Sequence, residues 1–129
     1  MKIASILARY LLGLQFTVFG LNGFLHFIPQ PPPANPLAIQ FLVGVSASHF
    51  AAFFFALQVL GGLLLLSGFF VPLALTVLAA ELYNILAFHI TLAPGAGPAL
   101  VACVLWVLVF LQYRENFKGI FSARQETRT

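Results

Sequence analysis

Glu81 is the residue of this chain with the clearest chemical meaning, because it is the single charged residue between Arg9 and Arg114. Polar groups in hydrocarbon are costly, so each of them requires a partner or a function. One interpretation makes Glu81 a proton-handling or hydrogen-bonding group inside a helical bundle. The other makes it an uncharged carboxyl that hydrogen-bonds Gln15, Gln58 or a backbone carbonyl and stabilises helix packing. The sequence leaves both interpretations open.

Imidazoles and amides form a second group of polar residues. The three histidines all fall near the same surface of the membrane, which the distribution of charges described below identifies as the outer surface. Asn22 lies one helical turn before His26. At about 100° per residue, Glu81, Asn84 and His89 fall within an arc of about 140° on one helix. The sequence therefore predicts a ligand-binding cluster in the outer half of the membrane, formed by Asn22, His26, His49, Glu81, Asn84 and His89.

Three kinds of chemistry would use such a cluster. Two histidines on facing helices ligate haem in bundle cytochromes. Histidine and carboxylate together bind divalent metals. Imidazole and amide groups hydrogen-bond the carbonyls of a quinone, with Glu81 exchanging protons. No ligand spacing such as H-x-x-x-H is present, so no metal site is predicted. The alternative is that these side chains cap helix ends and face lipid headgroups.

Composition places these residues in a membrane. The 129 residues are 61% hydrophobic and 7% charged, against about 45–50% and about 25% in soluble domains. All six basic residues lie in the two terminal segments, which favours anchoring beside anionic headgroups and leaves no basic patch for nucleic acid. Cys103 is the one cysteine, so disulfide exchange within the chain is excluded.

Four apolar runs have the length needed to cross about 30 Å of hydrocarbon. They cover approximately residues 3–28, 49–66, 72–92 and 98–113, separated by prolines and glycines that end helices. Because the basic residues flank the first and last runs, the positive-inside rule places both termini in the cytoplasm. The predicted fold is all-α: a polytopic membrane protein, a single domain over residues 1–129, built as a four-transmembrane-helix bundle.

Two shorter segments are predicted to lie on the membrane surface. Residues 37–45 are apolar but too short to cross, and they form an interfacial or re-entrant helix on the outer face or, alternatively, the start of the second span. In residues 113–121, aromatic and aliphatic side chains recur at helical spacing among basic ones, which indicates an amphipathic cytoplasmic segment.

Over nearly its full length the sequence resembles the DoxX family of small four-span bacterial membrane proteins. The matching stretches are residues 8–13 (ARYLLG), 19–24 (FGLNGF), 60–66 (LGGLLLL), 71–75 (VPLAL) and 84–89 (NILAFH). Asn22, Asn84 and His89 fall inside these stretches, whereas Glu81 belongs to no family motif. The resemblance implies a four-helix bundle in the bacterial inner membrane.

Named members of that family are linked to quinone-coupled sulfur oxidation and to oxidative-stress complexes, and a distant eukaryotic relative is a receptor-assembly chaperone. The resemblance therefore implies a membrane subunit that binds a lipophilic small molecule such as a quinone, beside redox-complex subunits that carry the cofactors. The alternatives are a non-catalytic scaffold or assembly factor and, third, a haem-binding protein. Homo-oligomerisation is expected for so small a bundle. Whether the chain is an enzyme is left open.

Overall fold

A computed structural model describes residues 2–127, and in this range the chain is all-helical, with five α-helices, one 3-10 helix and no strand. In chain order the elements are α1 (Lys2–Leu25), α2 (Pro36–Ala47), α3 (Phe50–Ser67), α4 (Val71–Thr91), α5 (Gly97–Tyr113) and the 3-10 helix η1 (Arg114–Phe117). Among these residues, four helices have the length and hydropathy of membrane spans: α1, α3, α4 and α5 continued by η1. The predicted fold class is confirmed.

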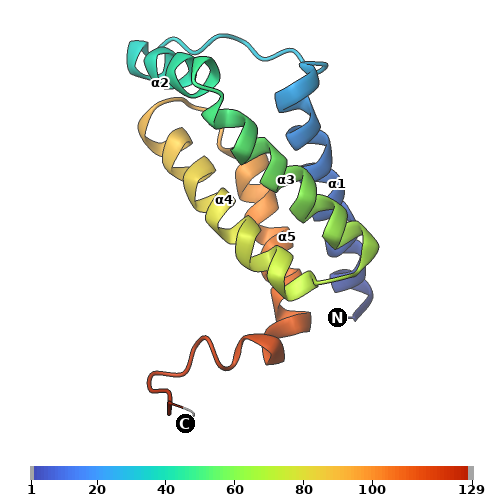
Figure 1. The fold of residues 1–129 in the computed structure, drawn as a ribbon. Coiled ribbons are helices and arrows are strands. Elements are labelled where there is room, and N and C mark those ends of the chain that lie inside the picture. The colour runs from blue at the N-terminus through green and yellow to red at the C-terminus, as the bar shows by residue number, and fades with distance from the viewer. Residues whose placement is uncertain (1, 128–129) are drawn as a thin grey trace.

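The four long helices close into a ring (Figure 1): α1 packs against α3 and α5, and α4 packs against the same two helices. Side chains join neighbouring helices through backbone carbonyls. The Ser5 hydroxyl on α1 donates to the Leu108 carbonyl on α5 at 2.9 Å, and the Trp106 indole on α5 donates to the Leu75 carbonyl on α4 at 2.9 Å. Such bonds add to the dispersion contacts that hold membrane helices together.

The α1–α3 interface is built on glycines. A methyl group on Gly62 would lie 2.7 Å from the Thr17 backbone nitrogen and 2.8 Å from the Gly13 carbonyl oxygen. A methyl group on Gly20 would lie 3.0 Å from the backbone nitrogen of Val59. The backbones of the two helices therefore touch, which only residues without a Cβ permit.

Arg9 occupies the end of the ring that carries the chain termini. Its guanidinium donates to the Leu65 carbonyl in the last turn of α3 and lies over the Tyr10 ring, 4.6 Å from the centroid. Gly68, in the left-handed conformation at φ 79°, ends α3 beside this guanidinium. The arginine thus satisfies a terminal carbonyl that the helix itself leaves unpaired.

The segment predicted at residues 37–45 lies within α2, a helix separate from α3. Asn35 caps it by accepting a hydrogen bond from the Leu37 backbone N–H at 2.9 Å, and Pro36 occupies its first turn. Only Ala38 of α2 is buried. The helix contacts α3, and Phe41 packs against Phe88 of α4 with the ring centroids 5.6 Å apart.

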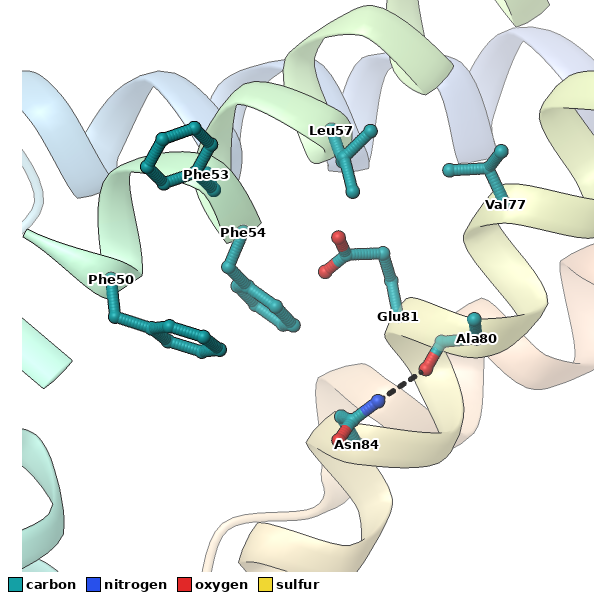
Figure 2. A pocket seen from close by; sticks show the side chains of 8 residues that line it. All are labelled: Phe50, Phe53, Phe54, Leu57, Val77, Ala80, Glu81 and Asn84. Atoms are coloured by element: carbon teal, nitrogen blue, oxygen red, sulfur yellow. Dashed lines mark hydrogen bonds between the residues drawn. The ribbon is translucent and has the colours of Figure 1, made fainter.

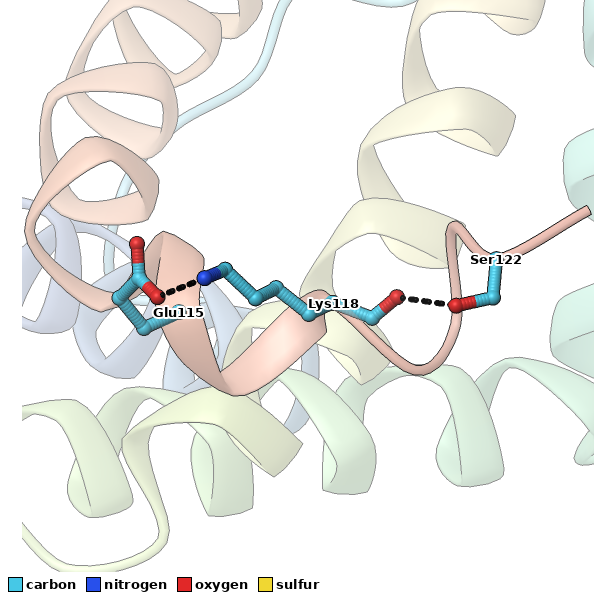
Figure 3. A network of polar contacts seen from close by, with 3 residues as sticks. All are labelled: Glu115, Lys118 and Ser122. Carbon is cyan, nitrogen blue, oxygen red and sulfur yellow. Dashed lines mark hydrogen bonds and ion pairs between the residues drawn. The ribbon is translucent and has the colours of Figure 1, made fainter.

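The segment after α5 is less regular than an amphipathic α-helix. It forms the short η1 and then a turn. Phe117 is buried and packs on Phe110 at a centroid distance of 5.0 Å, whereas Phe121 is exposed. Figure 3 shows the turn, where Lys118 pairs with Glu115 at 2.6 Å and its carbonyl accepts from the Ser122 hydroxyl at 3.0 Å. Both ends of the described chain lie at the same end of the ring (Figure 1).

Candidate functional site

A groove of about 410 Å³ opens between the first half of α3 and the middle of α4, in the half of the bundle farther from the termini. Figure 2 shows it from close by. Its lining is mostly apolar, with a carboxyl and an amide: Phe50, Phe53, Phe54, Leu57, Val77, Ala80, Glu81 and Asn84. We call this space the α3–α4 groove.

Helical spacing explains why these side chains meet. The α3 residues of the groove recur at positions i, i+3, i+4 and i+7, and the α4 residues repeat the same interval. Each set therefore occupies one face of its helix. One turn beyond Leu57, the two helices approach closely, since a methyl group on Gly61 would lie 2.7 Å from Leu78. The groove lies on the N-terminal side of this close contact along α3, where three phenylalanines line it.

Glu81 forms the polar part of the groove wall. It is only 4% exposed, and its carboxyl lies beside the Gln58 side chain of α3. The second carboxyl oxygen, Oε2, is buried and has no hydrogen-bond partner within residues 2–127. In Figure 2 the carboxyl points from α4 across the groove toward α3. Of the two glutamines considered from sequence, Gln58 is the one that lies beside Glu81, whereas Gln15 donates to the Pro98 carbonyl at 2.9 Å.

Asn84 lies one turn beyond Ala80 on the same side of the groove. Its amide nitrogen donates to the Ala80 carbonyl at 2.9 Å, a bond drawn in Figure 2. The side chain is exposed at the bundle surface. Because the nitrogen is used within the helix, the amide oxygen stays available as an acceptor. Glu81 and Asn84 are thus the two members of the predicted cluster that the structure places in one groove.

Asn22 and His26 instead shape the chain after α1. The buried Asn22 side chain accepts from the Ile28 backbone N–H at 2.7 Å and donates to the Ile28 carbonyl at 3.5 Å. His26 is exposed and left-handed at φ 52°, and its backbone N–H donates to the Asn22 carbonyl at 2.8 Å. Both residues therefore close the turn that ends the first span.

His49 and His89 lie at helix ends on the same side of the bundle. His49 is exposed and left-handed at φ 64° in the break between α2 and α3. His89, in the last turn of α4, is half-buried, with Nδ1 3.2 Å from the Ala93 carbonyl and its ring edge-on to Phe88. Neither lines the α3–α4 groove. In the described part of the chain, no three His, Cys, Asp or Glu side chains gather closely enough to hold a metal ion.

Two contributions to the groove were not singled out from sequence. The predicted cluster contains no phenylalanine, although Phe50, Phe53, Phe54 and Leu57 share the spacing of one helix face. Gln58 was one of several candidate partners for Glu81. The signal in the sequence is an apolar helix face opposite the one mid-span carboxyl, and a search for such a face would have found the phenylalanines and Gln58.

No family model, curated protein or solved structure matches this chain. The fold itself defines the class: four apolar helices in a bundle make this a multi-pass helical membrane protein. The resemblance to DoxX proteins therefore remains a prediction from sequence.

Proposed function

We propose that this protein binds a lipophilic small molecule, a quinone, in the α3–α4 groove and serves as a DoxX-like membrane subunit of a redox or oxidative-stress system. The observation that carries the proposal is the buried Glu81 Oε2 without a hydrogen-bond partner, beside three phenylalanine rings. A buried polar atom of this kind is costly unless something else satisfies it. A ligand with a polar ring group would do so.

The groove suits a quinone in size, polarity and access. Its volume of about 410 Å³ lies within the range of about 300–1,000 Å³ that small-molecule sites occupy. Aromatic side chains pack favourably on a flat ring. A protonated Glu81 carboxyl donates a hydrogen bond to a quinone carbonyl, whereas an ionised one is costly in hydrocarbon. Phe50, Phe53 and Leu57 are exposed on the bundle surface, so a ligand dissolved in the lipid enters from the side.

The charge distribution orients this site. All six basic residues lie in the terminal segments, and the described parts of those segments lie at one end of the ring. In the proposed orientation this end faces the cytoplasm of a bacterium, in its inner membrane. The α3–α4 groove then lies in the outer half of the bilayer. Partner subunits carry the redox cofactors in this arrangement.

Binding of a short-chain ubiquinone analogue to the purified protein in lipid nanodiscs tests the proposal. Glu81→Leu and Asn84→Ala each remove one polar group, so we expect the affinity to fall by about two- to tenfold, the equivalent of one hydrogen bond of about 0.5–1.5 kcal/mol. Val104→Ala, on the exposed face of α5, is the matched control and is expected to bind normally.

Unchanged affinity in both groove variants would overturn the proposed site. A constant protein partner together with no quinone binding would indicate the scaffold function instead. The absorbance spectrum of the purified protein tests the third alternative, haem binding, because bound haem gives a Soret band.

A further inference from the structure

The exposed surface of α4 combines large residues, among them Leu73, Tyr83 and Ile90, with a row of small and polar ones. Small and polar residues recur along it, all on the bundle surface: Thr76, Ala80, Asn84, Ala87 and Thr91. At about 100° per residue they fall within an arc of about 80°. We call this set the α4 stripe. The exposed positions of α5 are instead large and apolar, with Leu100, Val104 and Leu111 among them.

The polar members of the α4 stripe are folded back on their own helix. Thr76 donates to the Pro72 carbonyl at 2.9 Å and Thr91 to the Ala87 carbonyl at 2.7 Å. Their hydroxyls are therefore satisfied, and the stripe is a flat surface of small groups. Such surfaces let transmembrane helices approach closely, and they are enriched where helices associate. Within residues 2–127, α4 packs its other sides against α3 and α5 and leaves the stripe uncovered.

The stripe borders the α3–α4 groove. Ala80 and Asn84 belong to both, and Glu81, whose buried Oε2 has no partner in the described chain, lies on the groove side of them. Tyr83 lies on the opposite edge of the stripe and is 75% exposed. Viewed down the α4 axis, Tyr83 lies about 60° from Ala80 in one direction and Glu81 lies about 100° from it in the other. Along the axis, Tyr83 and Glu81 are about 3 Å apart.

We propose that a second copy of this chain packs its α4 stripe against the first, and that the Tyr83 of each copy closes the groove of the other. Both copies have the same charge distribution and so the same orientation in the membrane. In a parallel two-fold pair, the groove edge of one α4 meets the Tyr83 edge of the other at nearly the same height.

The second copy completes the binding site in this arrangement. Because Glu81 Oε2 is buried in the single chain, the Glu81 side chain turns toward the mouth of the groove to accept a hydrogen bond from the hydroxyl of the second copy's Tyr83. The tyrosine ring forms the wall on the lipid side. When a ligand is bound, the same hydroxyl faces the ligand's polar group. This contribution to the ligand rests on the proposed function, whereas the pairing of the α4 helices does not.

Cysteine cross-linking in native membranes tests the pairing. In a Cys103→Ser background, Ala80→Cys and Ala87→Cys place thiols in the centre of the stripe, and oxidation with copper phenanthroline is expected to give disulfide-linked dimers. The matched controls are Val104→Cys and Leu14→Cys, which lie near mid-span on the exposed faces of α5 and α1. Dimer yields at Ala80 and Ala87 no higher than at the controls would overturn the proposal.

Tyr83→Phe tests the contribution to the groove. It is expected to lower the affinity for the ubiquinone analogue several-fold while cross-linking through Ala87→Cys persists. Unchanged affinity in Tyr83→Phe would overturn the role of Tyr83. Efficient cross-linking with no quinone binding by the unmutated protein would instead contradict the proposed function and leave the α4 pairing intact. Quinone binding without cross-linking would contradict the α4 pairing and leave the proposed function intact.

Discussion

Gly62→Ala is the substitution with the most direct structural consequence, because a methyl group at Gly62 would meet main-chain atoms of α1 as well as the Thr17 side chain. Apart from the Thr17 hydroxyl oxygen, which a rotamer change moves aside, the new methyl carbon would lie 2.7 Å from the Thr17 nitrogen and 2.8 Å from the Gly13 oxygen. Both atoms belong to the main chain of α1, so no rotamer change relieves the clash. Reaching 3.4 Å, the lower limit of an ordinary contact, requires α1 to move away by about 0.7 Å (3.4 minus 2.7).

The size of the effect follows from the core that this movement would loosen. A buried leucine makes about 40–60 contacts of about 0.1–0.2 kcal/mol, and a gap of about 0.5–1 Å removes about a quarter to a half of each. Leu65 is fully buried beside Gly13. If half of its contacts face the gap, the loss is about 1–2 kcal/mol for this residue alone. Alanine gains about 1 kcal/mol over glycine in helix propensity, and the other contacts across the interface make the net loss about 1–3 kcal/mol.

Unfolding of the detergent-solubilised protein by sodium dodecyl sulfate, followed by circular dichroism, measures this loss. Gly44→Ala is the matched control, because a methyl group there meets no atom within 4 Å, and we expect that variant to unfold at the same point or later. If Gly62→Ala were as stable as Gly44→Ala, the backbone contact between α1 and α3 would be wrong.

Two further substitutions test polar contacts between helices. Arg9→Ala removes the donor to the Leu65 carbonyl, so the free energy of unfolding should fall by about 1.5–3 kcal/mol; Arg9→Lys should recover part of it in the same denaturation assay, and equal stability of all three proteins would contradict the contact. Trp106→Phe removes the indole donor to the Leu75 carbonyl but keeps an aromatic ring that stacks on Phe110. The free energy of unfolding should therefore fall by about 0.5–1.5 kcal/mol. Trp106→Ala should lose about 3–5 kcal/mol, and similar losses in the two Trp106 variants would show that the ring packing contributes little.

The spans were predictable because each depends on local chemistry. Ser67 and Gly68 end α3 as the sequence indicates, with Gly68 in the left-handed conformation that favours glycine. The first span is the exception, since it ends at Leu25 rather than near Pro29. The reason is a local contact that hydropathy does not reveal: the buried Asn22 side chain accepts a hydrogen bond from the Ile28 backbone N–H and turns the chain before the prolines are reached.

The candidate site was less predictable, because depth in a membrane is readable from sequence but rotation about the helix axis is not. His26, His49 and Glu81 were grouped by depth and by the arc of one helix. In the structure the histidines end helices or lie in the breaks between them, whereas Glu81 faces Gln58 across the α3–α4 contact. Which helices are neighbours is fixed by contacts such as Gly62 with Thr17, and these join residues far apart in the chain.

The ring of helices also has a consequence for how the protein is made. The contacts that close the ring join the first helix to the last, through Ser5 with Leu108 and Gln15 with Pro98. The ribosome supplies helices in chain order, so α1 and α3 are able to pair through their glycines while α5 is still unmade. Until α5 arrives, Ser5, Gln15 and the Leu75 carbonyl face lipid without their partners. The last helix to be synthesised is therefore the one that shields the polar groups of two earlier ones, and a chain truncated before α5 would present those groups to the membrane's quality-control proteases.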